Sequence, residues 1–255
     1  MLAGKTRSVS SKLLGVIEIF TASDVALSLS DIARKSDLPL ATTLRFVREW
    51  VAWGGLIRLD DGRYAVGTRL WEVGVQAPSL QSLRNAALPF LDDLLVGTRQ
   101  NAQLAILQGF ETLYVEKISA RNSTVLMSRV GMRLPLHATG VGLVLLANSG
   151  QNYIDEYLEL PLKKYTACTV VDPRQVRQRL ASIRVTGFVR AEEELHSGVI
   201  SLAAPVHDRS GRTVAAISAV VSVEQRNDRS LDMMVRVAGL GVSRALGFRG
   251  SRVAP

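Results

Sequence analysis

Cysteine is the scarcest residue type in this chain of 255 residues, because Cys168 is the only one. A single cysteine excludes an internal disulfide framework and any metal site built from several thiolates. We interpret Cys168 as a small buried side chain, which is the commoner role of a lone cysteine. A reducing compartment such as the cytoplasm suits this composition.

Long apolar runs are also missing. No run reaches the ~18 residues that a membrane-spanning helix needs. Residues 1–12 are polar and basic, and the apolar stretch of a signal peptide does not follow them. We therefore expect a cytoplasmic protein without a membrane partner.

The sequence motifs of common catalytic sites are absent as well. We find no Walker phosphate loop, no Gly-x-Ser-x-Gly elbow and no His-Glu-x-x-His pair. The three histidines, His137, His196 and His207, lack the spacing of metal ligands. An enzyme of small-molecule metabolism that uses His137 and a nearby Glu as an acid–base pair is an alternative, but it lacks a nucleophile and a cofactor site. We therefore expect no catalysis, cofactor or metal, and we interpret Glu192–Glu194 as a solvated acidic run.

Positive charge, in contrast, is in excess. The formal net charge is +8 and the sequence pI is about 10, which permits an anionic partner such as nucleic acid. The charge is spread along the chain, since residues 1–70 hold ten Lys and Arg against seven Asp and Glu. The assignment of function therefore depends on motifs and their geometry.

The first seventy residues predict three helices in close succession. Apolar residues at helical spacing over residues 13–20 predict the first helix. Ser30 is a good N-cap for a second helix, and Leu29 before it can act as a hydrophobic staple. Pro39 suits the first turn of a third helix, which Gly54 and Gly55 end.

The third helix, predicted from Pro39 to Trp53, should have two distinct faces. Its buried stripe is expected to consist of residues at helical spacing, namely Leu40, Leu44, Val47 and Val51. Its outer face then consists of the remaining residues of the first turns, namely Ala41, Thr42, Thr43, Arg45, Phe46 and Arg48. This outer face is basic and carries hydroxyl groups, which suits contacts with phosphates and bases.

A hairpin follows the third helix. Apolar residues alternate around Asp61-Gly62, a dipeptide typical of tight β turns. Two helices joined by a tight turn and followed by a hairpin form a winged helix-turn-helix, in which the second helix of the pair enters the major groove. We predict that the outer face of the third helix, with Arg58 and Arg63 of the wing, binds double-stranded DNA. A plain helical hairpin with a solvated charged face is the alternative.

The rest of the chain predicts an α+β domain on an antiparallel sheet, because strands occur mostly in hairpins and helices lie at the ends. The expected elements are a linker helix over 67–80, a helix over 82–98, two strands around Gly109-Phe110, a strand over 124–131, an apolar helix after Gly140-Val141-Gly142, a helix capped by Asp172 and Pro173, strands over 198–206 and 213–223, and a helix over 231–247.

This order of elements resembles the IclR family of bacterial transcription regulators over nearly the whole chain. The most specific parts are the winged helix, followed by Gly131–Ala147 and Gly187–Ser218. The resemblance implies a GAF-like effector domain that binds a small molecule, usually a carboxylate. It also implies homo-oligomers, either dimers or dimers of dimers. The expected domains are a winged helix-turn-helix over 1–68, a linker helix over 69–80, a GAF-like effector-binding domain over 81–248 and a tail over 249–255.

The resemblance also places the effector site. Ser201 and Ser218 match positions at which the family hydrogen-bonds its effector. The helix start at Gly140 and Val141 exposes backbone amides that can bind a carboxylate. The alternatives are hydroxyls satisfied by the backbone and glycines that permit close packing; a dinucleotide-binding loop is disfavoured because its third glycine is missing.

Three further residues belong to this predicted site. Leu126 and Leu134 match apolar pocket walls of the family, with core packing as the alternative. Arg129 can pair with a carboxylate through two hydrogen bonds, with an exposed strand position as the alternative. All of these residues are effector-binding predictions.

Three positions depart from the family pattern. Leu143 stands where a lysine is usual, so we assign no lysine role there. Asp37 stands where a glycine is usual at the bend between the two short helices. Ala191 stands where some members have an acid, which favours a monocarboxylic aromatic effector. The sequence thus predicts a ligand-responsive, DNA-binding transcription regulator, with repression and activation both open.

Overall fold

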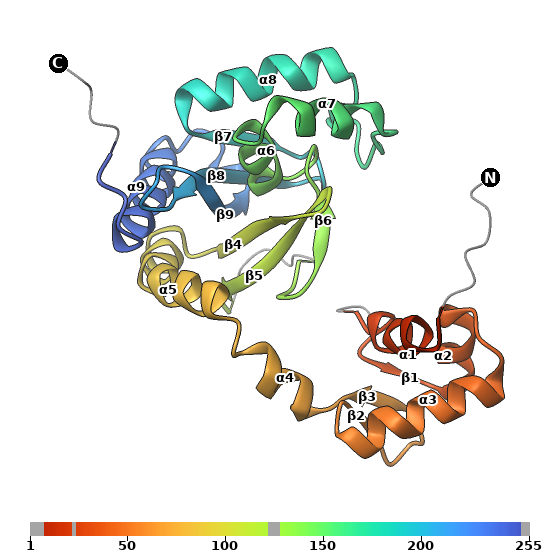
Figure 1. Ribbon diagram of the computed structural model, residues 1–255. Coiled ribbons are helices and arrows are strands. Elements are labelled where there is room, and N and C mark those ends of the chain that lie inside the picture. The colour runs from red at the N-terminus through yellow and green to blue at the C-terminus, as the bar shows by residue number, and fades with distance from the viewer. Residues whose placement is uncertain (1–7, 22–23, 122–127, 251–255) are drawn as a thin grey trace. The chain divides into compact units, whose positions relative to one another are not determined.

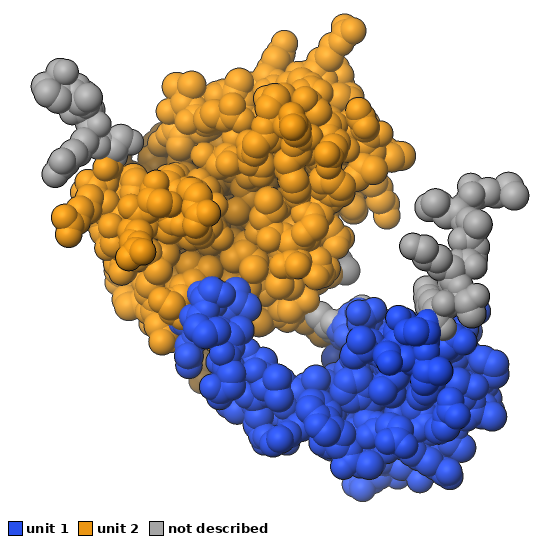
Figure 2. Space-filling view, viewed as in Figure 1, with its two compact units in different colours: residues 1–81 blue, residues 82–255 orange. Residues whose placement is uncertain are grey.

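The computed structural model describes residues 8–21, 24–121 and 128–250 (Figure 1). Contacts within the chain divide it into two compact units, residues 1–81 and 82–255 (Figure 2). Each unit has a hydrophobic core of its own. The two units are therefore described one after the other.

Unit 1 combines short helices with a three-stranded antiparallel sheet of order β1-β3-β2. Its elements are α1 Val9–Glu18, β1 Ala26–Leu27, α2 Leu29–Ser36, α3 Leu40–Trp53, β2 Leu56–Arg58, β3 Tyr64–Val66 and α4 Thr68–Gly74. Only three residues separate α2 from α3. The predicted helix-turn-helix with its hairpin is therefore present.

Local side-chain chemistry sets both ends of α2. The N-cap is Ser28 and not Ser30, because the Ser28 hydroxyl accepts the Asp31 N–H at 3.1 Å and donates to Asp31 Oδ2 at 2.6 Å. This two-way bond is close to a capping box, which explains why the earlier serine is used. Asp37 ends the helix in the left-handed region with φ of 56°. Aspartate tolerates that conformation better than most residues, so the usual glycine is not needed.

α3 buries a different face from the predicted one. Thr43, Phe46 and Val47 are buried, whereas Leu40 and Val51 are 55% and 37% exposed. The Thr43 hydroxyl can be buried because it donates to the Pro39 carbonyl at 3.1 Å. The Phe46 ring removes more apolar surface from water than a leucine would. Of the predicted buried stripe, only Val47 is fully buried.

The hairpin forms as predicted, but only part of its alternating apolar set is buried. The Leu59 N–H donates to the Arg63 carbonyl at 2.8 Å, and Gly62 has a φ of 84° in the turn. Leu56 and Tyr64 are buried, while Ile57 and Val66 are each 46% exposed. A shift of one residue in a strand exchanges its two faces. The core of unit 1 selects Leu56 because it packs with Phe46 and Val47.

Unit 2 is built on a six-stranded antiparallel sheet of order β6-β5-β4-β9-β8-β7. Its strands are β4 Asn101–Gln108, β5 Glu111–Ser119, β6 Arg133–Pro135, β7 Val189–Glu192, β8 Val199–His207 and β9 Thr213–Ser222. Its helices are α6 Gly140–Ala147, α7 Gln151–Glu159, α8 Pro173–Thr186, the short 3-10 helix η1 Val223–Gln225 and α9 Ser230–Ala245. α5, Pro78–Thr98, begins in unit 1 and continues into unit 2. The α+β class is confirmed (Figure 1).

The sequence mislocated some of these elements. One strand was predicted over residues 124–131. Residues 124–127 lie outside the described part, and residues 128–131 do not form a strand. The strand found here is β6, which starts at Arg133. Pro78 starts α5 and does not end the linker helix. β1, α7 and β7 were not predicted. β7 has only four residues and ends in Glu192, so its sequence does not show the alternation of a longer strand.

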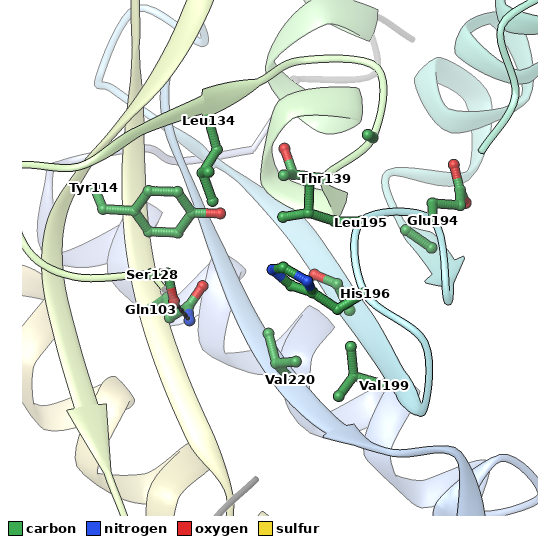
Figure 3. A pocket seen from close by; sticks show the side chains of 13 residues that line it. Gln103, Tyr114, Ser128, Leu134, Thr139, Glu194, Leu195, His196, Val199 and Val220 are labelled. Carbon is green, nitrogen blue, oxygen red and sulfur yellow. Dashed lines mark hydrogen bonds between the residues drawn. The ribbon is translucent and has the colours of Figure 1, made fainter. Parts of the chain in front are cut away.

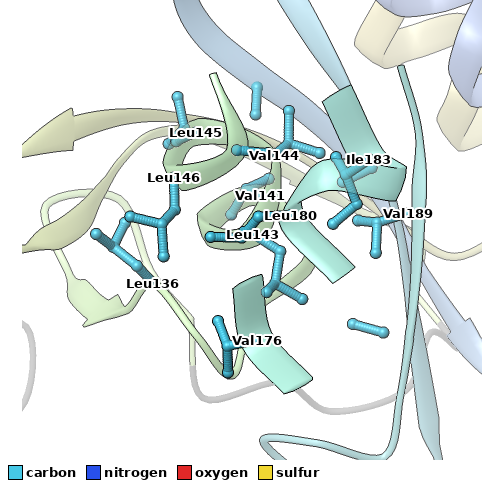
Figure 4. Packing of buried hydrophobic residues seen from close by; sticks show 14 of the residues in the cluster. Leu136, Val141, Leu143, Val144, Leu145, Leu146, Val176, Leu180, Ile183 and Val189 are labelled. Carbon is cyan, nitrogen blue, oxygen red and sulfur yellow. The ribbon is translucent and has the colours of Figure 1, made fainter. Parts of the chain in front are cut away.

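α6 fixes the geometry of the sheet face on which it lies. All eight of its residues are buried, and it packs between the sheet and α8 (Figure 4). Gly142 allows this close packing, since a Cβ there would lie 2.5 Å from the Leu136 carbonyl oxygen. The first turn of α6 is therefore held firmly at one place on the sheet.

Candidate functional site

The outer face of α3 is the first candidate site. Arg45 and Arg48 are exposed, Ala41 is exposed, and Thr42 is half-buried. Arg45 lies over the ring of Phe46, with 5.2 Å from Cζ to the ring centroid. A guanidinium held in this way is better ordered for a contact outside the protein than a free side chain.

For two of the predicted DNA-contacting residues, the predicted position on α3 is wrong. Thr43 and Phe46 were expected on the outer face, but their exposed fractions are 0% and 4%. Thr43 is held by the Pro39 carbonyl, and Phe46 belongs to the core of unit 1. Their contribution to this face is indirect, since they fix the helix that carries Arg45 and Arg48.

The wing arginines differ from each other. Arg58 ends β2 and is exposed. Arg63 is exposed but pairs with Asp61, at 2.7 Å between Nη2 and Oδ2. The Arg63 backbone N–H and side chain lower the pKa of Asp61, so this carboxylate stays charged. Part of the positive charge of Arg63 is therefore balanced within the hairpin.

The second candidate site is a cavity of about 50 Å³ in unit 2, on the sheet face that carries α6 (Figure 3). Residues from the strands, from the segment before α6 and from the loop between β7 and β8 form its wall. The lining residues are Gln103, Tyr114, Ser128, Leu134, Ala138, Thr139, Ala191, Glu194, Leu195, His196, Val199, Ser201 and Val220. Most of them are apolar or carry a single hydroxyl or amide group. Such a wall suits a small organic molecule with few polar groups.

The start of α6 lies at this cavity. The hydroxyl of Thr139, the N-cap, lines the cavity, accepts the Gly142 N–H at 3.1 Å and donates to the Pro135 carbonyl at 2.8 Å. The amides of Gly140 and Val141 precede the first intrahelical hydrogen bonds and have no acceptor within the helix. Ser201 lies against this turn, because a Cβ on Gly140 would be 2.5 Å from Ser201 Oγ. Two amides and one hydroxyl thus lie close together.

Ser201 and Ser218 differ in position, and Ser218 is not among the described residues that line the cavity. Ser201 lines the cavity. Ser218 is fully buried and pairs across the sheet with Gln103, which lines the cavity. Within the described part of the chain its hydroxyl has no hydrogen-bond partner. A buried hydroxyl in that state costs free energy until a water or a ligand satisfies it.

The remaining predicted effector-binding residues differ in whether they line the cavity. Leu134 lines the cavity. The side chain of Val141 is 1% exposed and belongs to the core, so only its backbone amide is available. Arg129 is exposed and is not among the described residues that line the cavity. Leu126 lies outside the described residues.

Several lining residues were not predicted from the sequence. Gln103 Nε2 donates to Ser128 Oγ at 2.7 Å, and Lys117 Nζ donates to the Ser128 carbonyl at 2.7 Å. Burial, together with the nearby Arg129, lowers the pKa of Lys117. Burial raises the pKa of Tyr114 well above its usual value, so its hydroxyl stays neutral. The sequence feature that could have indicated this part of the site is the polar Gln103 inside an otherwise apolar strand.

The loop between β7 and β8, residues 193–198, closes one side of the cavity. It was interpreted as part of a solvated acidic run, but Glu194 is only 5% exposed and pairs with Arg179 at 2.6 Å. The Glu194 carbonyl accepts the Thr169 hydroxyl at 2.7 Å. Glu193 has a left-handed φ of 55°, and its carboxylate accepts the Gly198 N–H at 2.8 Å. These bonds hold the loop in one conformation.

His137 is sealed inside the protein and has no free ring nitrogen. Its Nδ1 lies 2.7 Å from the Tyr157 hydroxyl, and its Nε2 lies 2.9 Å from the Lys163 carbonyl. Burial lowers its pKa, although the Lys163 carbonyl and the charge of Glu194 oppose this shift. Glu194, the acid beside it, is held by Arg179. The pair lacks the free lone pair and proton that acid–base catalysis requires.

Other site classes find no support in the described part of the chain. Across residues 8–21, 24–121 and 128–250, no group of three or more His, Cys, Asp and Glu side chains could hold a metal ion. Nor does any helix in these ranges have the length and apolar character to cross a membrane. Cys168 is exposed, which corrects its interpretation as a buried side chain.

A helix-turn-helix with a hairpin wing, followed by a sheet domain with a small-molecule cavity, defines a class of ligand-binding transcription regulators. Family models agree with this class. Residues 11–58 match the IclR helix-turn-helix domain, and residues 75–244 match the Bacterial transcriptional regulator IclR C-terminal family. The chain belongs to the IclR family of bacterial transcription regulators.

Known proteins of this family are similar over most of the chain. The HTH-type transcriptional regulator XynR of Escherichia coli (strain K12) is 30% identical over 242 residues, which are 93% of this chain and 96% of XynR. The Pca regulon regulatory protein of Pseudomonas putida is 30% identical over 240 residues, 91% of this chain and 80% of that protein.

A solved structure is similar as well. An IclR homolog from Microbacterium hydrocarbonoxydans, complexed with 4-hydroxybenzoate, is 33% identical with a TM-score of 0.89. The match covers 94% of this chain and 99% of that one. XynR and the Pca regulon protein are regulators by name.

Proposed function

We propose that this chain binds an operator through α3 and the wing, and that a small organic acid in the unit 2 cavity alters that binding. Residues 1–68 form the DNA-binding domain, residues 69–80, with most of α4 and the start of α5, form the linker, and residues 81–248 form the effector domain. The protein acts as a homo-oligomer, a dimer or a dimer of dimers. Effector binding shifts the population between two subunit arrangements and so changes half-site spacing.

One observation supports the acid effector above the others. The amides of Gly140 and Val141 lack intrahelical acceptors at the start of a fully buried helix, and the Ser201 hydroxyl lies against the same turn. The N-terminus of a helix favours a negatively charged group. The orphan hydroxyl of Ser218 lies beside the same wall. A carboxylate in the cavity satisfies the two amides and the Ser201 hydroxyl at once.

The apolar part of the wall supports an aromatic body for this acid. Leu134 and Tyr114 lie on one side of the cavity, and Val199 and Val220 lie on another (Figure 3). Ala191 adds no charge to the lining. The similar structure that holds 4-hydroxybenzoate supports the same class, a monocarboxylic aromatic acid.

The DNA contacts of this proposal rest on residues that are exposed or half-buried. Arg45 and Arg48 of α3 contact bases or phosphates, Thr42 and Ala41 contact the groove, and Arg58 and Arg63 contact the backbone beside it. Thr43 and Phe46 are not among the contacts, because they are buried. Some similar proteins are named repressors, such as AllR of Escherichia coli, which supports release of DNA as the response to the effector.

The test compares acids with their own neutral amides. Operator fragments are first selected from genomic DNA with the full-length protein. Operator release is then measured with benzoate and 4-hydroxybenzoate, with short aliphatic keto acids, and with the amide of each acid. We expect acids to act at lower concentration than their amides, since an amide lacks the charge that the helix start favours. Equal action of acids and amides would remove the α6 amides as the anchor.

The enzyme alternative has a direct test in the same samples. No observation on His137 favours it, because both ring nitrogens are bonded. Stoichiometric binding without chemical change of the acid is the expected result. Turnover of the acid, followed by chromatography, would replace the regulator proposal for unit 2.

A further inference from the structure

His196 is a titratable side chain in the wall of the cavity. It lies on the loop between β7 and β8, and it is half-buried. Figure 3 shows its imidazole directed into the cavity, among the labelled side chains of Thr139, Val199 and Val220. The other two histidines are engaged elsewhere: His137 is sealed by Tyr157 and Lys163, and His207 contacts Thr213 and Phe248 at the end of β8.

The position of this imidazole is fixed by its loop. Glu194, two residues before His196, is held by Arg179 of α8 through two close oxygen–nitrogen contacts. The Glu193 N–H donates to the Val199 carbonyl at 2.8 Å, which closes the loop at its base. Leu195 and His196 are therefore presented to the cavity before any ligand arrives, which lowers the entropy cost of binding.

The charged groups near the cavity are mostly engaged with other protein groups. They therefore offer little formal positive charge to an entering anion. Glu194 and Arg179 neutralise each other. Lys117, on the β5 side, is turned to the Ser128 carbonyl, and burial lowers its pKa. Tyr114 is neutral because burial raises its pKa. The α6 start supplies only partial positive charge.

We propose that His196 recognises the charge of the effector. It binds the effector carboxylate as an imidazolium, while the α6 amides and Ser201 bind the same carboxylate. This role rests on the proposed acid effector. The protonated ring supplies a full positive charge and an N–H donor, which form the stronger kind of hydrogen bond with a carboxylate. A neutral ligand can accept the N–H bond but gains no charge pairing, so His196 favours acids over their amides and esters.

Binding and proton uptake are linked in this arrangement. The proposed contact with the carboxylate requires a positive charge on His196. A bound carboxylate favours that charge, so the complex takes up a proton wherever the free imidazole is neutral. Affinity is then highest at low pH and falls as pH rises through the range of about 5 to 8 in which imidazoles titrate. At the limit, Kd rises about tenfold for each pH unit.

The experiment is calorimetric titration of the full-length protein with 4-hydroxybenzoate and with benzoate, between about pH 5.5 and 8, where imidazole is the side chain that ordinarily titrates. Each pH is measured in buffers of different ionisation enthalpy, because the slope of the enthalpy against buffer ionisation gives the protons taken up. We expect proton uptake near pH 7.5 and a Kd that rises with pH. 4-Hydroxybenzamide should bind more weakly, with no pH dependence.

Two variants assign the proton to one residue. His196→Gln keeps a side chain of similar size without a titratable group, so the Kd for the acids should rise severalfold at pH 6 and become independent of pH. His207→Gln makes the same change at the far end of β8 and should leave both Kd and proton uptake unchanged. Unchanged thermal melting and operator binding of both variants show that they are folded.

The outcomes separate this inference from the proposed function. Acid binding that is independent of pH, or equal in His196→Gln and in the unchanged protein, overturns the role of His196 and leaves the acid effector standing. Proton uptake that persists in His196→Gln assigns the proton to another group and overturns it as well. No binding of either acid overturns the aromatic-acid effector together with the role of His196.

Discussion

Two helices carry the proposed recognition surfaces of this chain, and they do so by opposite means. α3 has fourteen residues and keeps Arg45 and Arg48 exposed. α6 has eight residues, and every one is buried. In the proposed recognition, side chains make the contacts of α3, whereas backbone amides make those of α6. A helix that offers its backbone must be packed closely against its surroundings, because only a fixed first turn presents two amides to one ligand.

Because of this difference, substitutions in the two helices should affect different properties of the protein. Substitutions on the outer face of α3 should change DNA binding without changing folding, since surface positions contribute little to stability. Substitutions in α6 should first change folding, because each side chain there fills a close-packed core.

The largest effect is expected for truncation within α6. Leu143→Ala removes a fully buried side chain from the core between the sheet and α8. Lost burial and the cavity left behind should lower the free energy of unfolding by about 2–5 kcal/mol. Urea denaturation followed by circular dichroism measures this change.

Leu40→Ala is the matched control on α3. Leu40 is 55% exposed, so the same truncation should change the free energy of unfolding by no more than about 0.5 kcal/mol. If both variants lost stability equally, α3 would bury the stripe that its periodicity suggests, and the contrast between the two helices would be wrong.

A smaller effect is expected on DNA binding. Arg45→Ala should weaken operator binding by about 1–3 kcal/mol and relax sequence preference if the guanidinium contacts a base. If Arg45 contacts only phosphate, affinity should fall evenly across sequences and the salt slope should drop by about 1. Fluorescence anisotropy with operator and scrambled duplexes, at several salt concentrations, distinguishes the two.

The control for Arg45 is an arginine of the other unit. Arg174→Ala removes an exposed arginine at the start of α8 and should leave operator affinity unchanged. Thermal melting should be the same for both variants. An equal loss of affinity in the two would reduce the role of Arg45 to one of general positive charge.

Much of the fold was predictable because local chemistry determines it. Asp172 and Pro173 mark the start of α8, and Gly62 marks the wing turn, as the sequence predicts. The order of hairpins and helices predicted the α+β class. The register of β2 and the rotation of α3 were not predictable, because they depend on which apolar groups meet in the core of unit 1.

The cavity was less accessible to sequence reasoning than the fold. Gly140, Ser201 and Leu134 could be placed from a family resemblance. Glu194 and His196 could not, because their roles depend on how the loop between β7 and β8 folds back against Arg179 of α8. Contacts between residues distant in sequence leave no periodic pattern, so the acidic run looked like a solvated surface and His196 gave no signal of a binding role.

The smallest expected effect tests the corrected face of α3. Thr43→Val keeps the shape of a fully buried side chain but removes the hydroxyl that donates to the Pro39 carbonyl. The carbonyl keeps its bond from the Thr43 N–H at 2.9 Å, so the loss should be about 0.5–1.5 kcal/mol of unfolding free energy, with operator affinity unchanged. Thr42→Val makes the same change on the half-buried neighbour and should do the reverse, weakening operator binding without changing thermal melting. A variant of Thr43 that melted normally but bound the operator more weakly than the Thr42 variant would return Thr43 to the DNA-binding face.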